Sequence, residues 1–251
     1  IGGVMWNNAV EVAKLFEVGD VVSVRAKVNT YQGRLQLQVD QVLPLQESDY
    51  NIEDLVYTHE NTNKDFARLR TVLDTVQNPF LRLLLDSFWS DDAFIERLNA
   101  AAAAKKWHHE YRGGLVRHCY EMAKIAETMC DLYPELDRDI LLTGVLIHDL
   151  GKLEEMDHDL FVDYNNAGKL LGHLQLGCDM LQTRIAAIEN FPDKLRMELL
   201  HAILSHHGSF ENGSPVLPKT LEAIVLHHID NLDAQAAAFT RVIAETRERG
   251  Q

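Results

Sequence analysis

Cysteine is scarce in this sequence, whose thiols are Cys119, Cys130 and Cys178 in a chain of 251 residues. An odd number of widely spaced cysteines does not make the disulfide framework of a small secreted domain. Long apolar runs are missing as well, which excludes a transmembrane helix, since such a helix needs about 20 mostly apolar residues. We therefore expect reduced thiols, a cytoplasmic location and no membrane partner.

An excess of basic residues is also missing. Lys and Arg number 24 against 38 Asp and Glu, which gives a formal net charge of -14. Such an acidic surface repels nucleic-acid phosphates and excludes tight non-specific binding to duplex DNA. A nucleic-acid function would instead need a local basic groove, or a site where metal ions supply the positive charge.

The first region of the chain reads as β structure. Residues 19–45 contain two β-branched runs that predict strands, joined by a hairpin turn at Tyr31-Gln32-Gly33-Arg34. A short helical pattern at 10–16 and the end of an earlier strand at 3–6 precede them. This order is that of the second half of a five-stranded OB barrel, with the first strands upstream of Ile1. Another small antiparallel sheet fits the pattern equally well.

From Lys64 on, the sequence predicts helices separated by polar, Gly- or Pro-containing segments. We therefore predict a mainly α protein in three parts: a partial antiparallel OB-type module at 1–46, a polar linker at 47–63 and an all-helical domain at 64–251. Within that domain, Ala100 to Ala104 is expected to be helical, because alanine is the best helix former. Gly151 is expected to end a helix in the left-handed conformation.

His148 and Asp149 follow an apolar helical run that should carry them into the interior. An unpaired buried carboxylate is unfavourable, and a cation or metal ion relieves it. Alone, the dipeptide also fits a hydrogen-bonded His–Asp pair at a helix end. The rest of the chain favours a metal, because metal-capable residues recur within apolar stripes on five successive helical segments. These residues are His118, His148 with Asp149, His173, His206 with His207, and His227, His228, Asp230 and Asp233.

The order of these residues resembles the pattern of the HD-domain metal-dependent phosphohydrolases, in which His118, His148-Asp149 and Asp230 would be the defining set. The intervening His173 and His206-His207 resemble the subset with two metals. Longer stretches, at 113–118, 146–152, 171–173, 204–208 and 226–234, are similar to the 3′→5′ exoribonucleases of the YhaM type. That family has an OB fold before its HD domain, which implies the same arrangement here.

The resemblance implies two divalent metal ions. Mn²⁺ is the metal that the family suggests, although mixed His and Asp ligands also suit Fe, Co, Ni or Zn. Two such ions lower the pKa of a shared water, and the resulting hydroxide attacks the phosphodiester. The implied ligands are His118, His148, Asp149 and Asp230 for the first ion, and His173, His206 and His207 for the second, with Asp149 bridging.

Three further residues could act around these ions. Lys152 is our candidate for stabilising charge on the phosphate or the leaving oxygen, and the alternative is an ordinary lysine at a helix C-terminus. His227 and Asp233 lie one helical turn from Asp230, and we expect them to support the ligands from behind.

Substrate contacts are expected in two places. His108, His109 and Arg112 precede the first ligand helix and would line a nucleotide entrance, or serve their loop alone. On the hairpin, Tyr31 and Arg34 would hold a single strand by stacking and charge, while Tyr31 would equally suit simple packing on the sheet.

Three functions fit these features. The first is a metal-dependent 3′→5′ exonuclease that degrades single-stranded RNA to nucleoside 5′-monophosphates, with DNA open as a second substrate. The second is an HD phosphohydrolase acting on a small nucleotide, as a nucleotidase, cyclic-nucleotide phosphodiesterase or triphosphohydrolase; the acidic charge favours it and the OB-type module disfavours it. The third is a non-enzymatic interaction protein, which the intact ligand set disfavours. The sequence leaves open whether the chain forms a homo-oligomer.

Overall fold

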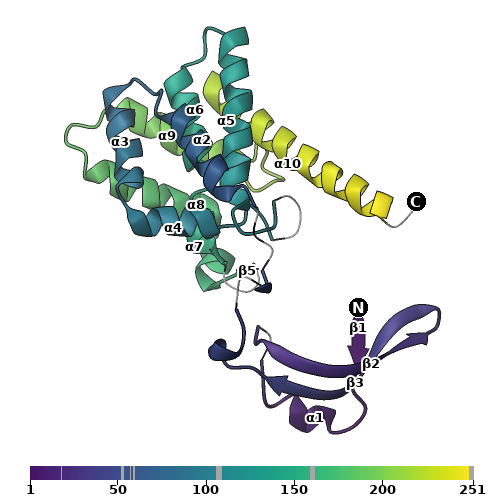
Figure 1. The fold of residues 1–251 in the computed structure, drawn as a ribbon. Helices are drawn as coiled ribbons and strands as arrows, with labels where there is room; N and C mark the ends of the chain where they lie inside the picture. The colour runs from purple at the N-terminus through teal and green to yellow at the C-terminus, as the bar shows by residue number, and fades with distance from the viewer. Residues whose placement is uncertain are drawn as a thin grey trace. The chain divides into compact units, whose positions relative to one another are not determined.

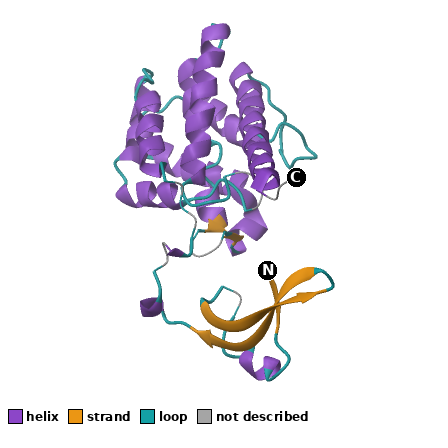
Figure 2. Ribbon diagram, turned by 45° about the vertical axis from the view of Figure 1, so that its right-hand side comes forward, coloured by secondary structure: helices purple, strands orange, loops and turns teal. Residues whose placement is uncertain are grey.

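The computed structural model describes residues 1–17, 19–51, 54–56, 58, 60–105, 109–158 and 162–248. The chain divides into two compact units, Ile1–Val56 and Tyr57–Gln251, and each is described by itself. The first holds a small sheet and the second is built of helices (Figure 1, Figure 2), so the mainly α fold class predicted from the sequence is confirmed. Across the described ranges, no helix combines the length and apolarity needed to cross a bilayer.

The first unit is a three-stranded sheet in the order β1-β3-β2. Strands β2 and β3 form an antiparallel hairpin, and β1 adds parallel to β3. The turn residues Gln32 and Gly33 have φ of 50° and 76°, and two left-handed residues in succession match the twist of a hairpin. The elements are β1 (Gly2–Val4), α1 (Ala9–Val12), β2 (Val22–Tyr31), β3 (Arg34–Pro44) and the 3-10 helix η1 (Glu47–Asp49).

The second unit begins inside the predicted polar linker, and its first helix starts at Thr62, two residues before the predicted start. A short antiparallel pair, β4 and β5, lies in a segment that the sequence predicts to be a loop. The elements are α2 (Thr62–Leu73), α3 (Pro79–Trp89), α4 (Asp92–Ala100), α5 (Gly114–Leu132), α6 (Arg138–Ile147), α7 (Lys152–Glu155), β4 (Met156–Asp157), β5 (Asp163–Tyr164), α8 (Asn166–Ala186), α9 (Asp193–Ser205) and α10 (Leu221–Glu248).

Side chains fix where several of these helices begin. Asn78, Asp91, Asp137 and Asn165 each accept a hydrogen bond from a backbone N–H in the first turn of α3, α4, α6 and α8, respectively. The first N–H groups of a helix lack partners within the helix, and Asn and Asp caps supply them. Local sequence thus sets the starting points of these four helices.

Helix α6 is the buried centre of the second unit. Every residue from Leu141 to Ile147 is buried, and the helix packs against α5, α9 and α10. A helix that is apolar on all sides lies in a core. Helix α6 ends at Ile147 within this core. His148 and Asp149 follow directly and are therefore buried as well, with side chains that are 0% and 2% exposed.

Gly151 is not the left-handed helix cap that the sequence predicts, so that prediction was wrong. Its φ of -60° and ψ of -19° are right-handed, and α6 has already ended. The glycine is needed for space, since a Cβ there would lie 1.9 Å from the carbonyl oxygen of His173 and 2.6 Å from the amide nitrogen of Gly177. Gly151 therefore lets α8 approach the segment that follows Asp149.

The alanine run was also predicted wrongly as helix. Helix α4 ends at Ala100, and Ala101 is extended with φ of -72° and ψ of 137°. Ala101 to Ala103 are fully buried. The carbonyl oxygen of Ala101 accepts from the N–H of Leu115 at 3.0 Å, and the N–H of Ala103 donates to the carbonyl oxygen of His109 at 3.1 Å. Tertiary packing of small residues thus overrides helix propensity here.

Candidate metal centre

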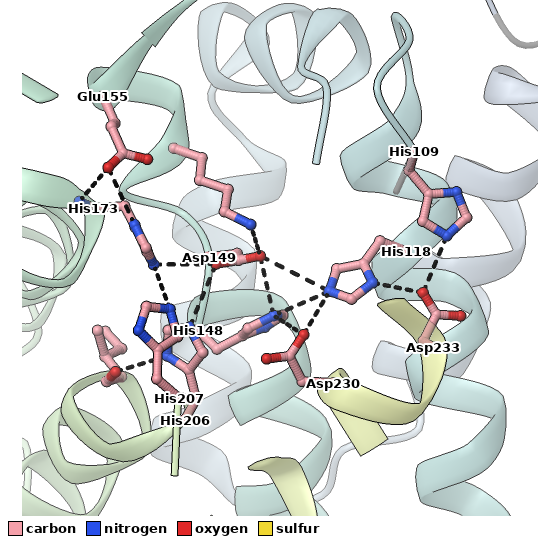
Figure 3. A network of polar contacts seen from close by, with 12 residues as sticks. His109, His118, His148, Asp149, Glu155, His173, His206, His207, Asp230 and Asp233 are labelled. Atoms are coloured by element: carbon pink, nitrogen blue, oxygen red, sulfur yellow. Dashed lines mark hydrogen bonds and ion pairs between the residues drawn. The ribbon is translucent and has the colours of Figure 1, made fainter. Parts of the chain in front are cut away.

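Five helices bring metal-capable side chains to one buried place in the second unit (Figure 3). Among the described residues, three groups of ligand atoms there are close enough to share an ion, and two of them consist of residues named as ligands from the sequence. The third, His109, His118 and Asp233, is joined by hydrogen bonds at 2.7 and 3.0 Å. All seven residues named as ligands from the sequence lie at this place. They are His118 in α5, His148 and Asp149 directly after α6, His173 in α8, His206 and His207 directly after α9, and Asp230 in α10.

Hydrogen bonds fix which nitrogen of four of these imidazoles faces inward. In each of them Nδ1 bonds an oxygen outside the centre, so the lone pair of a neutral ring resides on Nε2 and points at the centre. This is the state in which imidazole binds a metal ion. The Nδ1 partners are the carbonyl oxygen of Val145 for His148 (2.9 Å), that of Ile203 for His206 (2.8 Å), Asp233 for His118 (2.7 Å) and Glu155 for His173 (3.3 Å).

The first group of ligand atoms comes from His118, His148 and Asp230. The two Nε2 atoms are 3.3 Å apart, and Oδ1 of Asp230 lies 3.3 Å from Nε2 of His118 and 4.0 Å from that of His148. Ligand atoms sharing an ion at bond lengths of 2.0–2.1 Å lie about 3.0–3.4 Å apart. The separations in this group are therefore close to those of a metal coordination shell.

The second group comes from His173, His206 and His207. Nε2 of His173 lies 3.2 Å from Nε2 of His207, and the ring centroids of His206 and His207 are 4.4 Å apart. Three imidazoles brought together in this way offer nitrogen lone pairs to one small volume. A cation would satisfy all three at once.

Asp149 connects the two groups. Its Oδ2 lies 3.3 Å from Nε2 of His148, on the side of the first group. Its Oδ1 lies 3.6 Å from Nε2 of His206 and 3.7 Å from that of His173, on the side of the second group. Oδ1 is buried and has no hydrogen-bond partner among the described residues. Because a buried carboxylate oxygen without a partner is unfavourable, the donor set fits two divalent cations with Asp149 between them.

Lys152 partly compensates the charge of Asp149. Its Nζ donates to Oδ2 of Asp149 at 2.6 Å, and its side chain is 13% exposed. Burial alone would raise the pKa of the Asp149 carboxyl, but the Lys152 ammonium and the neighbouring imidazoles hold it well below the usual value. Asp149 is therefore ionised and able to bind a cation at neutral pH.

The protonation of the histidines follows from their surroundings. Burial alone would lower the pKa of His118, but hydrogen bonds to Asp230 and Asp233 raise it to about 9. Burial and repulsion from neighbouring imidazoles lower the pKa of both His206 and His207. His206 and His207 are thus neutral at pH 7, while His118 holds a proton that a divalent cation would displace.

Two residues predicted to support the ligands contact them. Oδ2 of Asp233, which is 5% exposed, accepts from Nδ1 of His118 at 2.7 Å. Nδ1 of His227 donates to the backbone carbonyl oxygen of His206 at 2.7 Å. Such outer partners set the orientation of metal ligands.

Glu155 is a contact that sequence reasoning missed. Its Oε1 accepts from the backbone N–H of His173 at 3.1 Å and lies 3.3 Å from Nδ1 of the same residue. Gly172, with φ of 73° and ψ of 159°, interrupts α8 directly before His173, so the N–H of His173 is available to Glu155. No local spacing signals this contact, because it depends on that interruption and on how α7 packs against α8.

The predicted nucleotide entrance is not supported by the placement of His109. His108 lies outside the described residues, and Arg112 forms an isolated bridge with Thr58. His109 is 8% exposed and hydrogen-bonded to Asp233 at 3.0 Å. A buried ring hydrogen-bonded to Asp233 does not line an entrance, so the structure corrects the expectation for His109, whereas for Arg112 it stays a prediction.

In the first unit, Tyr31 and Arg34 are both exposed and pair across the hairpin next to its turn. With Gly2, Gln32 and Gln36, they line a groove of about 560 Å³. The groove offers an aromatic ring, a guanidinium and amides, which are the groups that contact a single strand by stacking and charge. The two residues remain candidates for substrate binding.

Comparisons with known families agree with this geometry. Residues 115–235 match the HD domain family, and residues 1–45 match a family described as OB-fold nucleic acid binding domain. No solved structure matches the chain with significance. The HD match contains each ligand of both groups, and the OB-fold match contains the whole three-stranded sheet.

The second unit therefore contains an HD domain, a class that indicates a metal-dependent hydrolase. With its N-terminal OB-fold domain, the protein has the HD plus OB architecture of the YhaM-like proteins. The OB fold indicates that the hydrolase acts on nucleic acid.

Proposed function

We propose that this protein is a 3′→5′ exonuclease that hydrolyses single-stranded RNA to nucleoside 5′-monophosphates with two divalent metal ions, Mn²⁺ by preference, and with DNA as a further substrate to be tested. The observation that supports a two-metal hydrolase most strongly is Asp149, whose two oxygens face two separate groups of imidazoles. RNA as substrate and the 3′→5′ direction rest on the shared architecture with the YhaM-like proteins.

In such a site, different residues would hold each of the two ions. His118, His148 and Asp230 would hold one ion, His173, His206 and His207 the other, and Asp149 both. When bound, two such ions supply positive charge to a phosphate and lower the pKa of water. Asp233, Glu155 and the backbone oxygens that accept from Nδ1 keep four of the rings in the tautomer that binds a cation, namely those of His118, His173, His148 and His206.

Substrate length separates this proposal from the main alternative, a phosphohydrolase of small nucleotides, which the net charge of -14 favours. A single-strand exonuclease with an OB-fold domain gains binding energy from nucleotides far from the cut. We therefore expect kcat/KM with Mn²⁺ to rise at least about tenfold from a dinucleotide to a 20-mer RNA. Labelling either end of the 20-mer shows the direction of degradation. Equal kcat/KM for both lengths would favour the small-nucleotide enzyme.

Lys152 is expected to act on the substrate as well as on Asp149. Replacing Lys152 with Ala should lower kcat by about 10²-fold, the cost of losing one charge-stabilising donor, while two metal ions stay bound. Lys169, an exposed lysine on α8, provides the control, and Lys169→Ala should change neither quantity. Metal content by mass spectrometry and single-turnover rates measure both. Unchanged turnover in Lys152→Ala would mean that Lys152 serves only as the charge partner of Asp149.

A further inference from the structure

The backbone conformation of His109 is constrained by contacts with neighbouring segments. Its φ of 46° lies in the left-handed region, which is uncommon for a residue other than glycine. Its carbonyl oxygen accepts from the N–H of Ala103 at 3.1 Å. Gly114 makes room for the same oxygen, since a Cβ at Gly114 would lie 1.9 Å from it. Residues held in such conformations concentrate at functional sites, so the role of the ring needs an explanation.

The ring of His109 is hydrogen-bonded at both nitrogens. Nδ1 lies 2.9 Å from the hydroxyl of Tyr111, and Nε2 lies 3.0 Å from Oδ2 of Asp233. Since an ionised carboxylate only accepts, Nε2–H of His109 donates to Asp233, and Nδ1 shares a hydrogen bond with the hydroxyl of Tyr111. The same Oδ2 of Asp233 also bonds Nδ1 of His118 at 2.7 Å (Figure 3).

Oδ2 of Asp233 therefore accepts hydrogen bonds from two imidazoles, those of His109 and His118. His109 approaches it from the segment before α5, and His118 approaches it from α5 itself. Glu121 also lies close, with Oε2 3.5 Å from Nε2 of His109, and its carboxyl interacts with that of Asp233 as well, so the ring of His109 donates between two acidic side chains that contact each other. Without His109, Asp233 would lose a donor that fixes its position, while the neighbouring carboxyl of Glu121 would remain.

We propose that His109 is a positioning residue for the metal ligand His118, acting through Asp233. This role rests on the proposed metal-dependent function and belongs to the first group of ligands alone. The second group has its own outer partner, Glu155, on His173. Weakening the contact between His109 and Asp233 therefore lowers the affinity of one ion and leaves the other unchanged.

Two substitutions that differ by one methylene test this role. The amide nitrogen of His109→Gln reaches about the place of Nε2 and can donate to Asp233, whereas that of His109→Asn reaches only about the place of Nδ1. Loss of an outer partner typically weakens metal binding about 10- to 100-fold. In the full chain, we expect the Asn variant to raise the Kd for the first ion about tenfold and the Gln variant to stay within about threefold of wild type.

Calorimetric titration of Mn²⁺ into chelator-stripped protein measures these constants. A His207→Ala background removes a ligand of the second group only, so that the titration reports the first group alone. Combining His109→Asn with Asp233→Asn tests whether His109 acts through Asp233. The double variant should bind Mn²⁺ no more than about twofold more weakly than Asp233→Asn alone, because the effects of substituting two contacting residues are not additive. Circular dichroism in chelator shows whether each variant is folded. If His109→Asn does not fold, Tyr111→Phe replaces it, with an expected weakening of about threefold.

The result that would overturn the proposal is a folded His109→Asn variant that binds the first ion like wild type. Equal weakening by Asn and Gln, or of both ions together, would overturn it as well. If the wild-type protein binds no Mn²⁺, the metal-dependent function fails first, and the role of His109 fails with it. If metal binds and only the His109 variants show no effect, the inference alone is wrong.

Discussion

Replacing Asp149 with Ala is expected to remove both metal ions and to lower the rate of hydrolysis at least about 10³-fold, more than the loss of an outer partner costs. The reason is that Asp149 is the one ligand residue with an oxygen toward each group, at 3.3 Å from His148 and 3.6 Å from His206. Metal content by mass spectrometry should fall from two ions per chain to none. Two ions retained in the variant would contradict the assignment of Asp149 as the shared ligand.

The same substitution has a consequence for stability. Asp149→Ala leaves the ammonium of Lys152 without its 2.6 Å partner in a largely buried place, and breaking such a buried pair costs about 3–5 kcal/mol. An ion that binds only the folded state raises the unfolding temperature, so Mn²⁺ should stabilise the wild type and leave Asp149→Ala unchanged. Asp179→Ala, which changes an exposed aspartate on α8, is the matched control.

Replacing Gly151 with Ala is expected to disrupt the second unit without changing any proposed ligand side chain. The new Cβ would lie 1.9 Å from the carbonyl oxygen of His173 and 2.6 Å from the amide nitrogen of Gly177. Both are backbone atoms, so α8 must move as a whole. Overpacking of this kind costs about 1–3 kcal/mol or more, which corresponds to roughly 3–10 °C in Tm for a unit of this size. Because His173 moves with α8, we also expect the variant to lose affinity for the second ion.

Gly144→Ala provides the control for that experiment. Gly144 lies inside α6, and a Cβ there would meet the end of the Leu226 side chain at 3.3 Å, a contact that a small side-chain shift relieves. Alanine is the better helix former by about 1 kcal/mol, so Tm should hardly change. Thermal unfolding followed by circular dichroism compares the two variants. A Gly151→Ala protein as stable as Gly144→Ala would show that α8 does not need the close approach seen here.

Much of the fold followed from local pattern. The apolar run before His148 predicted a buried helix, and the hairpin turn at Gln32-Gly33 predicted the pairing of β2 and β3. The run at Ala100–Ala104 failed as a prediction, because propensity describes an isolated segment and Ala101 to Ala103 are packed between other segments. The proposed ligands were accessible to sequence reasoning because their residue types are unusual within apolar helices.

The sequence alone determined the candidate donors, the order in which helices carry them and the apolar segment that buries His148 and Asp149. Tertiary structure decided which nitrogen of four of the imidazoles faces inward, how the oxygens of Asp149 divide between two groups, and that Gly151 is needed for space. It also showed that His109, which the sequence analysis placed at an entrance, shares the carboxylate of Asp233 with His118. The physical reason is that periodicity and capping involve residues a few positions apart, whereas these features arise from contacts between segments far apart in the chain.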